Sequence, residues 1–384
     1  MKYLYITLLL SLLCLINSFS QEDGQEISIG KYHIINSHIL DEERKILVHL
    51  PIGYETTDLD YPVIYHLYGD FVMTYFADAA VTIERIFDAG MMPQAILIGV
   101  DNTDRYTHLR PIARDGSTGG MEKFFNYLKE ELMTYINSNF RTAGFDILVG
   151  PQAGACFGLC ALIKHTDLFD AIILENSFDN PSNIDDYLLG EMEEFFSPGK
   201  TLDKYLFMTL HKGSRNMEVA LKEKAIIEAN TPTNFDFYFK LDEPSYFRPY
   251  KTNLDEAIRT LYNGYKMPED YPVENFGDIL RYYDDLSESI GYKVNITDRI
   301  LYLAGDKISQ KGNQAEAKKT YEFILESYPS SLDGLFRLAR METSAGNFEK
   351  AKTYYERFLS IRPSETFIRT QLNAVNDSIM KKRQ

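Results

Sequence analysis

Short apolar runs recur through the first two thirds of the chain and predict buried strands. Three of them, Ile147–Val149, Ala171–Leu174 and Phe207–Leu210, are each followed by glycine or polar residues typical of turns. The segment that follows the first run, Ala155–Lys164, is rich in small and apolar residues and predicts a helix. Strands that alternate with helices indicate an α/β fold with a doubly wound sheet.

The turn between the first run and its helix reads Gly150-Pro151-Gln152-Ala153-Gly154. A strand, a sharp turn flanked by glycines and a helix form the nucleophile elbow of α/β-hydrolases, where the pattern G-x-S-x-G exposes a serine hydroxyl. Gly150 and Gly154 supply the small residues that let backbone and helix approach closely. The central residue here is Gln152, whose carboxamide cannot be activated by a histidine to attack a carbonyl. The sequence therefore predicts the strand, turn and helix of a nucleophile elbow, but no nucleophile at its centre.

The last third of the chain contains an internal repeat of 34 residues. Glycine, alanine, tyrosine and proline recur at this offset, as Gly312, Ala317, Tyr321 and Pro329 and again as Gly346, Ala351, Tyr355 and Pro363. Small, aromatic and proline residues at this period are the tetratricopeptide (TPR) signature, in which each repeat is a pair of helices. We therefore expect an all-α TPR-type domain, which serves either as a stabilising appendage or as a concave peptide-binding surface.

The domain boundaries follow from these patterns. We expect a signal peptide at 1–20, an α/β-hydrolase domain at 21–265, a connector at 266–294, and two TPR-like repeats plus a capping helix at 295–384. The helical stretch Phe276–Ile290 forms the core of the connector, and Phe367–Lys382 is the expected capping helix. The connector should dock the repeats onto the hydrolase domain.

The N-terminus predicts export. Lys2 is followed by the apolar stretch Leu4–Ile16, which is short for a membrane span, and by Ser18-Phe19-Ser20, small residues of the kind found before a cleavage site. A signal peptide cleaved after residue 20 places the protein in the periplasm or outside the cell; a retained anchor is the alternative. No other stretch is long and apolar enough to predict stable insertion in a membrane.

Charge and cysteine content exclude several classes of function. The formal net charge is −16, which argues against nucleic acid or an anionic membrane as partner. After processing only Cys156 and Cys160 remain, four residues apart on one helix face, where we expect them to pack as small apolar side chains. The chain has no zinc-ligand spacing, phosphate loop or dinucleotide fingerprint. We therefore expect no metal and no cofactor.

Several ordered segments resemble the putative-esterase (esterase D-like) family of α/β-hydrolases, which includes siderophore and feruloyl esterases. The segment Tyr61–Gly69 is similar to the family's third strand, and Met92–Val100 with Asn102 and Arg105 to the segment after it. Gly119-Gly120 with the spacing up to Arg141-Thr142 matches a further family motif, and Leu168–Ala171 matches the lead-in to the strand after the elbow helix. The resemblance spans about residues 27–262 and implies the α/β-hydrolase fold.

This resemblance assigns the catalytic positions, and most of them are degenerate. Gln152 stands at the nucleophile position, Ser245 stands where the family has its histidine, and Asn216 or Glu218 is nearest to the position of the acid. The family's oxyanion hole would use the N–H of Ala153 and one from the loop at Tyr68-Gly69-Asp70. Serine and histidine act as a unit, so removal of either abolishes most of the catalysis.

A relocated site is the alternative. His211 lies at the end of a predicted strand, where sheet enzymes place functional groups, and Ser177 follows another strand. His66 and His108 lie on segments that border the site in relatives. We expect these residues to form a hydrogen-bonded polar rim instead, because a relocated triad needs a geometry that sequence does not define.

Three functions remain open. The first is an exported pseudoenzyme whose pocket binds a small ligand, or whose TPR repeats bind a protein or peptide partner. The second is an active serine-type carboxylic-ester hydrolase with a non-standard site. The third is a TPR adaptor on an inert hydrolase scaffold.

Overall fold

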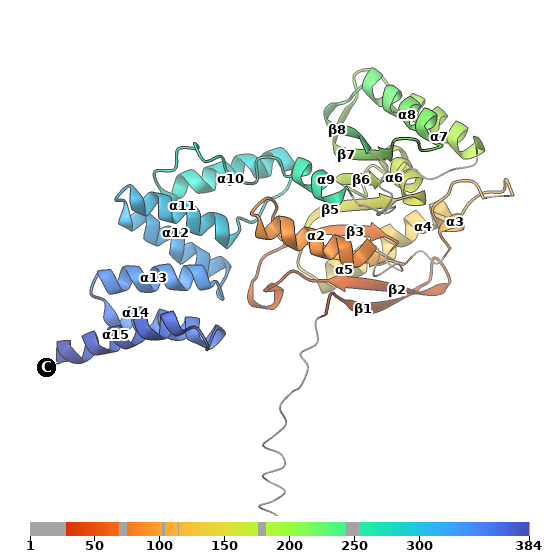
Figure 1. Cartoon of the computed structure of the whole chain (residues 1–384). Coiled ribbons are helices and arrows are strands. Elements are labelled where there is room, and N and C mark those ends of the chain that lie inside the picture. The colour runs from red at the N-terminus through yellow and green to blue at the C-terminus, as the bar shows by residue number, and fades with distance from the viewer. Residues whose placement is uncertain are drawn as a thin grey trace, which may run out of the picture.

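The computed structural model describes residues 28–68, 75–101, 104–113, 115–175, 182–242 and 253–383 (Figure 1). Its strands are β1 (Lys31–Ser37), β2 (Glu42–His49), β3 (Tyr61–Leu67), β4 (Ile96–Val100), β5 (Thr142–Pro151), β6 (Ala171–Glu175), β7 (Thr201–His211) and β8 (Thr233–Asp242). They form one sheet of eight strands in the order β1-β2-β4-β3-β5-β6-β7-β8. The strands β3 to β8 run parallel, whereas β2 pairs antiparallel with both β1 and β4.

Helices cover both faces of this sheet. The short segments are η2 (Tyr54–Thr56), α3 (Arg105–His108), α4 (Met121–Asn126), the π-helical η4 (Tyr127–Leu132) and α5 (Met133–Asn139). The longer helices are α2 (Ala77–Asp88), α6 (Ala153–Lys164), α7 (Ser182–Phe195), α8 (Met217–Ala229) and α9 (Leu254–Leu261). Every residue of β3, β4 and β6 is buried, as expected of parallel strands that helices cover on both sides.

Alternate residues of the central strands divide the interior between two cores. Tyr65 and Leu148 pack with α4 and α6 on one face of the sheet, while Ile64 and Ile147 pack with α2 and α9 on the other. This alternation follows from the two-residue period of side chains along a strand. Cys156 and Cys160 are both buried and free on α6, in the packing role that their spacing predicts.

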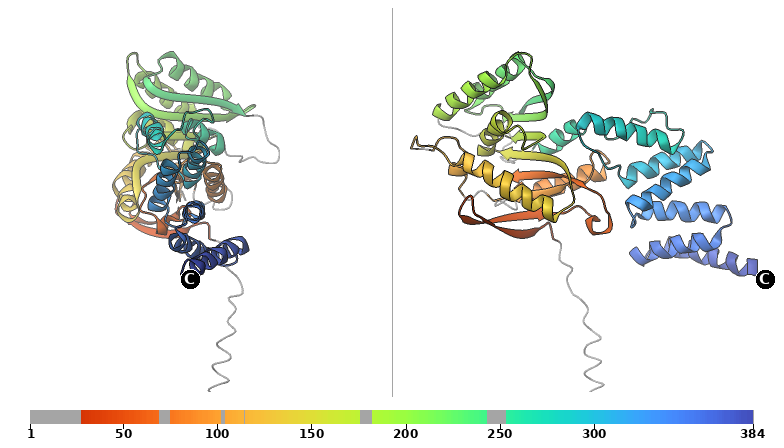
Figure 2. Two further views of the ribbon diagram at one scale, coloured as in Figure 1. Left: turned by 90° about the vertical axis from the view of Figure 1, so that its left-hand side faces the viewer. Right: turned by 180° about the vertical axis from the view of Figure 1, so that it is seen from behind.

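In the last third of the chain, the secondary-structure elements of the described residues are all helices. It consists of α10 (Phe276–Ile290), α11 (Asp298–Gln310), α12 (Gln314–Ser327), α13 (Leu332–Ser344), α14 (Phe348–Ile361) and α15 (Thr366–Arg383). The helix predicted within the connector coincides with α10, and the capping helix differs from α15 by one residue at each end. Figure 2 shows these helices extending away from the sheet towards the C-terminus.

The first helix pair of this tail shares a core with the hydrolase part. Ile300 and Leu301 of α11 and Ile324 of α12 belong to the same buried cluster as Ile147 of the sheet. Beside them the Tyr292 ring stacks on Phe145 with 4.5 Å between ring centroids. The second pair, α13 and α14, builds a separate core with α15. The tail is therefore docked through its first repeat.

A small residue is required where the helices of the first repeat cross. A Cβ atom on Gly305 of α11 would lie 2.5 Å from Cε1 of Tyr321 on α12, a distance at which one of the two must move. Ala339 and Tyr355 occupy the equivalent positions 34 residues later, and both are buried. The small and aromatic residues of the repeat thus meet in space as the TPR pattern predicts.

Among the helices described, none combines the length and the apolar character needed to cross a membrane.

Candidate functional site

The turn from β5 to α6 has the geometry of a nucleophile elbow. Gln152 lies alone between the end of the strand and the first residue of the helix, with φ +52° and ψ −117°. Residues other than glycine rarely adopt positive φ, and the conformation costs on the order of 1–3 kcal/mol. Two backbone hydrogen bonds hold the turn: the Gln152 N–H donates to the carbonyl of Glu175 over 2.8 Å, and its carbonyl accepts from Ala155 N–H over 2.9 Å.

Gly150 is required for this turn, and Gly154 lies in a tight contact beside it. A Cβ on Gly150 would lie 2.4 Å from the carbonyl oxygen of Gly154, and a Cβ on Gly154 would lie 3.1 Å from Cδ1 of Leu67. The strand, the helix and β3 approach closely because both side chains are absent. The structure thus preserves the strained turn that presents a nucleophile in α/β-hydrolases.

The side chain at the apex is held by an aromatic neighbour. Gln152 is half-buried, and its Nε2 donates a hydrogen bond of 2.8 Å to the hydroxyl of Tyr75. The Tyr75 ring lies 6.0 Å from the ring of His66 and 5.9 Å from that of Tyr68, measured between centroids. The carboxamide therefore sits against a cluster of rings at the carboxyl end of the sheet.

His66 is a neutral part of this cluster. It is fully buried on β3, and burial lowers its pKa to about 4. Its Nδ1 bonds to the carbonyl of Leu67, so Nδ1 carries the proton and the buried Nε2, which has no partner among the described residues, is an acceptor. Neutral His66 thus lies next to the Tyr75 ring that holds Gln152. No hydrogen bond between described residues joins His66 to Gln152.

The structure describes two of the four residues predicted for the oxyanion hole, Ala153 and Tyr68. Ala153 is the first residue of α6, so its N–H belongs to the set that a helix leaves without an intrahelical partner. Tyr68 is buried and has φ +69°, a conformation that turns the chain sharply after β3. The remaining predicted members of this loop, Gly69 and Asp70, lie outside the described residues.

The other predicted site residues are scattered. His211 is half-buried at the end of β7, opposite Asp242 of β8. Asn216 is buried at the N-cap of α8, where its side chain makes no capping bond. Glu218 is exposed, and its carboxylate pairs with Lys222 at 2.8 Å, so it stands on the solvent face of α8.

Two further predicted positions, Ser177 and Ser245, lie outside the described residues. His108 stacks on Phe124 with 5.4 Å between centroids, and burial lowers its pKa. Its contacts are those of a packed aromatic side chain.

A buried carboxyl group next to the elbow is absent from the sequence-based prediction. Glu175 ends β6, pairs with Pro151 in the sheet register and is fully buried. Burial raises its pKa to about 8, and the charges of Asp78 and Asp242 add to the rise. The signal was available, because Glu175 is an acidic residue directly after an apolar strand, at the sheet edge where functional groups gather.

Asn253, the N-cap of α9, connects this carboxyl group to the edge strand β8. Its backbone N–H donates to Oε1 of Glu175, and its Nδ2 donates to Oδ2 of Asp242. Its Oδ1 accepts from Lys240 Nζ at 3.3 Å, and the same ammonium lies 3.2 Å from Asp242 Oδ1. The carboxyl ends of β6 and β8 are therefore joined through one asparagine.

The histidines do not complete a hydrolytic dyad with the residues described. All seven lie in the described part of the chain. The hydrogen bonds between their rings and other side chains go to tyrosine or glutamate, for example His49 to Glu84 at 3.0 Å and His165 to Glu122 at 3.1 Å. None goes to a described serine, threonine or cysteine. The described residues also contain no group of three acidic, histidine or cysteine side chains placed to hold a metal.

Solved structures share this fold at low sequence identity. An IroE-like serine hydrolase from Shewanella oneidensis aligns with a TM-score of 0.62 and 22% identity, over 76% of this chain and 98% of that one. An uncharacterised protein from Capnocytophaga ochracea aligns with a TM-score of 0.54 and 16% identity, over 90% of this chain and 99% of that one. The siderophore hydrolase EstB from Aspergillus nidulans aligns with a TM-score of 0.52 and 17% identity, over 66% and 99% of the two chains. These similarities establish the α/β-hydrolase fold.

Family models identify both parts of the chain. The comparison with curated proteins found no match. A tetratricopeptide repeat model matches residues 333–364, which cover α13 and α14. The model described as "Putative esterase" matches residues 37–228, half of the chain, and this range contains the elbow and strands β3 to β7. The protein is therefore a member of the putative esterase family of α/β-hydrolases, with a tetratricopeptide repeat in its C-terminal helices.

Proposed function

We propose that this chain is an exported, esterase-like pseudoenzyme that binds a ligand or a protein instead of hydrolysing esters. The observation that carries the proposal is Gln152 at the apex of an otherwise preserved elbow, with its Nε2 engaged by the Tyr75 hydroxyl. A carboxamide at this position offers no nucleophile. The family's histidine position is held by Ser245, so the two members that act as a unit are both replaced.

The geometry that remains favours binding over turnover. The N–H of Ala153 at the start of α6 can still donate to an oxygen atom, since helix N-termini favour anions and polarised carbonyls. Gln152 adds a carbonyl acceptor, and Tyr75 adds an aromatic wall. We therefore propose that a small ligand with a carboxylate or ester carbonyl binds beside the elbow and is held without cleavage.

The helical tail supplies the second binding surface of the proposal. Stacked helix pairs form extended surfaces that bind other chains, and the tail is anchored to the hydrolase part through its first repeat. Export rests on the apolar stretch Leu4–Ile16 and the small residues after it. It would place both surfaces in the periplasm or outside the cell.

The direct test is an assay with p-nitrophenyl acetate, p-nitrophenyl butyrate and a feruloyl ester. The purified protein should release no product above the buffer rate. Gln152→Ser alone should remain inactive, because no histidine is in place to accept the proton. Gln152→Ser combined with Ser245→His and Asn216→Asp should give weak activity, since each acid–base contribution is worth about 10² to 10⁴ in rate.

Activity of the unaltered protein, abolished by His211→Ala, would refute the pseudoenzyme proposal. It would support the second candidate, an ester hydrolase with a non-standard site. His211 favours that candidate because it ends β7 at the carboxyl edge of the sheet and its buried Nδ1 has no partner among the described residues. Activity of Gln152→Ser alone would likewise show that a working base is already present.

A further inference from the structure

The strand β1 forms one end of the sheet. It lies next to β2, pairs with it along all seven of its residues, and has no described element on its other side (Figure 1). An edge strand directs the N–H and C=O groups of alternate residues away from the sheet. These groups are free to pair with a strand of another chain.

The two faces of β1 differ in packing. On one face, Nδ1 of His33 is hydrogen-bonded to the hydroxyl of Tyr135 on α5 over 2.9 Å, and Ile35 is buried in the core. On the other face, Tyr32 is 54% exposed and Ile34 is 55% exposed. Two large apolar side chains that face solvent near the centre of an unpaired strand indicate an interaction surface.

The opposite edge of the sheet shows how such a surface is protected. The edge strand β8 carries three charged residues, Asp236, Lys240 and Asp242. Charged side chains on an edge strand discourage pairing with a further strand. After Lys31, its first residue, β1 contains no lysine, arginine or carboxylate. The centre of β1 therefore lacks the protection that β8 has.

A second copy of β1 fits this edge in one antiparallel register. The seven residues overlap fully when Ile34 of one copy faces Ile34 of the other, because Ile34 is the midpoint of the strand. Tyr32 then lies opposite Asn36, and Lys31 lies opposite Ser37. This arrangement has the twofold symmetry of an isologous dimer, and it continues the antiparallel pairing between β1 and β2.

The same register brings together two opposite charges. Ser37 donates a hydrogen bond to Oε2 of Glu131 on η4. Oε1 of that carboxylate accepts from the N–H groups of His38 at 2.8 Å and Ile39 at 3.1 Å. No described lysine or arginine forms an ion pair with Glu131, and Lys31 is exposed without a described carboxylate partner.

The distance across a strand pair allows these charges to meet. Lys31 and Ser37 are six positions apart, so their side chains leave the same face of β1. Opposite residues of antiparallel strands have Cβ atoms about 4.5–5.5 Å apart. Lys31 of each copy can therefore reach the Glu131 carboxylate beside Ser37 of the other copy.

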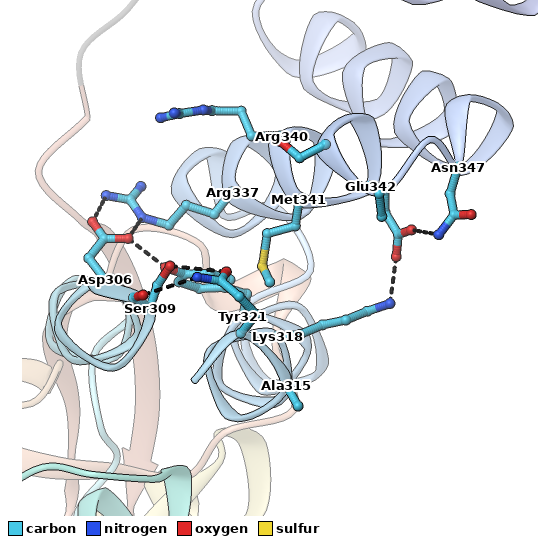
Figure 3. A pocket seen from close by; sticks show the side chains of 13 residues that line it. Asp306, Ser309, Ala315, Lys318, Tyr321, Arg337, Arg340, Met341, Glu342 and Asn347 are labelled. Carbon is cyan, nitrogen blue, oxygen red and sulfur yellow. Dashed lines mark hydrogen bonds and ion pairs between the residues drawn. The ribbon is translucent and has the colours of Figure 1, made fainter. Parts of the chain in front are cut away.

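In the helical tail, by contrast, two ion pairs close within the chain itself. Arg337 of α13 pairs with Asp306 of α11 at 2.7 Å, and Lys318 of α12 pairs with Glu342 of α13 at 2.6 Å. Both pairs line the polar cavity of the tail (Figure 3). The two charges at the β1 edge have no such partners within one copy. Their complementarity favours a second copy of the chain as the occupant of this edge.

We propose that the protein forms a twofold dimer in which the β1 strands of two copies pair antiparallel and join both sheets into one. Two ion pairs between Lys31 and Glu131 flank the paired strands, and Ile34 packs against its counterpart on the axis. Seven residues a side make a small interface, so we expect a Kd on the order of 10 µM. The dimer does not depend on the proposed ligand-binding function.

Sedimentation velocity of the protein comprising residues 21–384, from about 1 to 200 µM, tests the proposal. The sedimentation coefficient should rise with concentration as monomer converts to dimer. Ile34→Lys places two lysines opposite each other on the axis and should raise Kd at least about tenfold. Lys31→Glu places like charges beside each other at two points and should raise Kd at least about threefold.

Val81→Lys is the matched control for Ile34→Lys. Val81 lies on α2 and is 61% exposed, so the variant makes the same kind of change on another surface. It should change Kd less than about twofold. Unchanged thermal unfolding of each variant, followed by circular dichroism, controls for folding.

Cysteine cross-linking tests the register. The Ile34→Cys variant should form an intermolecular disulfide under mild oxidation, because opposite Cα atoms lie about 4.5–5.5 Å apart. The Tyr32→Cys variant should cross-link much more slowly, since the two copies of this residue are four positions out of register, about 13 Å along the strand. Cys156 and Cys160 are buried and present in both variants.

Several results would overturn the dimer. A monomer at every concentration, without cross-linking of Ile34→Cys, would do so directly. A dimer that Ile34→Lys leaves intact, or that Val81→Lys weakens equally, would place the interface on another surface. Equal cross-linking of the Ile34→Cys and Tyr32→Cys variants would refute the register, and an unchanged Kd in Lys31→Glu would refute the ion pairs.

Discussion

Replacement of the buried carboxyl group of Glu175 by a carboxamide should stabilise the protein, and the gain should grow with pH. Glutamine keeps an oxygen that can accept from the Asn253 N–H, as Oε1 of Glu175 does. It carries no charge at any pH. The Glu175→Gln variant therefore removes the cost of burying a charge while it preserves the contact.

The magnitude follows from the shift in pKa. Burial raises the pKa of Glu175 from 4.5 to about 8, so the folded state binds the proton more tightly than the unfolded state. Stability from this group is highest below about pH 4.5, falls as the pH rises, and levels off above about pH 8. At about 1.4 kcal/mol per pH unit, the carboxyl group costs less than about 1 kcal/mol at pH 5 and about 3 kcal/mol at pH 7.

Urea unfolding at pH 5, 7 and 8 measures this difference. The chain has no tryptophan, so far-ultraviolet circular dichroism is the suitable signal. Asp146 and Glu223 also have pKa values raised to about 7 by burial, but they are present in both proteins and cancel in the comparison. Glu218→Gln, at an exposed carboxylate paired with Lys222, is the matched control and should leave the stability unchanged at every pH, because solvent screens an exposed ion pair.

Parallel stability profiles of the unaltered protein and Glu175→Gln between pH 5 and 8 would refute this reasoning. They would mean that Glu175 is ionised in the folded protein and compensated by its partners. Destabilisation by Glu175→Gln at pH 8 would lead to the same conclusion more strongly, because it would show that the negative charge itself is required.

Three further predictions concern the packing and a second buried carboxyl group. Gly150→Ala should destabilise the protein by about 2–4 kcal/mol in urea unfolding, because its Cβ would lie 2.4 Å from the Gly154 carbonyl oxygen. The control is Gly190→Ala on α7, whose Cβ would meet nothing within 4 Å and which should be neutral or stabilising. Equal effects of the two substitutions would contradict the elbow geometry. The isolated segment 295–384 should unfold at a lower temperature and less cooperatively than the full chain, because its first repeat buries apolar side chains against the hydrolase core; a cooperative, high-melting monomer in circular dichroism would contradict the docked arrangement. Glu223→Gln should be stabilising at pH 8 and near neutral at pH 5, since burial raises the Glu223 pKa to about 7; a gain independent of pH in urea unfolding would contradict this.

The sequence by itself determined the features that depend on near neighbours in the chain. The elbow could be predicted because Gly150, Gln152 and Gly154 lie within five residues, and a strand, a tight turn and a helix impose their own residue types. The helical tail could be predicted because its 34-residue period repeats the same small and aromatic positions. The helix Phe276–Ile290 was found with the predicted bounds for the same reason, since amphipathic periodicity is a local property.

Only the tertiary structure decided which distant residues meet. The partner of Gln152 is Tyr75, 77 positions away, and the partner of the Glu175 carboxyl group is the N–H of Asn253, 78 positions away. Glu218 was a predicted candidate for the acid and lies on the solvent face of α8, because the direction of a helical side chain depends on which helix face packs inward. Burial that raises the pKa of a carboxyl group is set by the many elements that close over it, and a pattern along one segment does not contain that information.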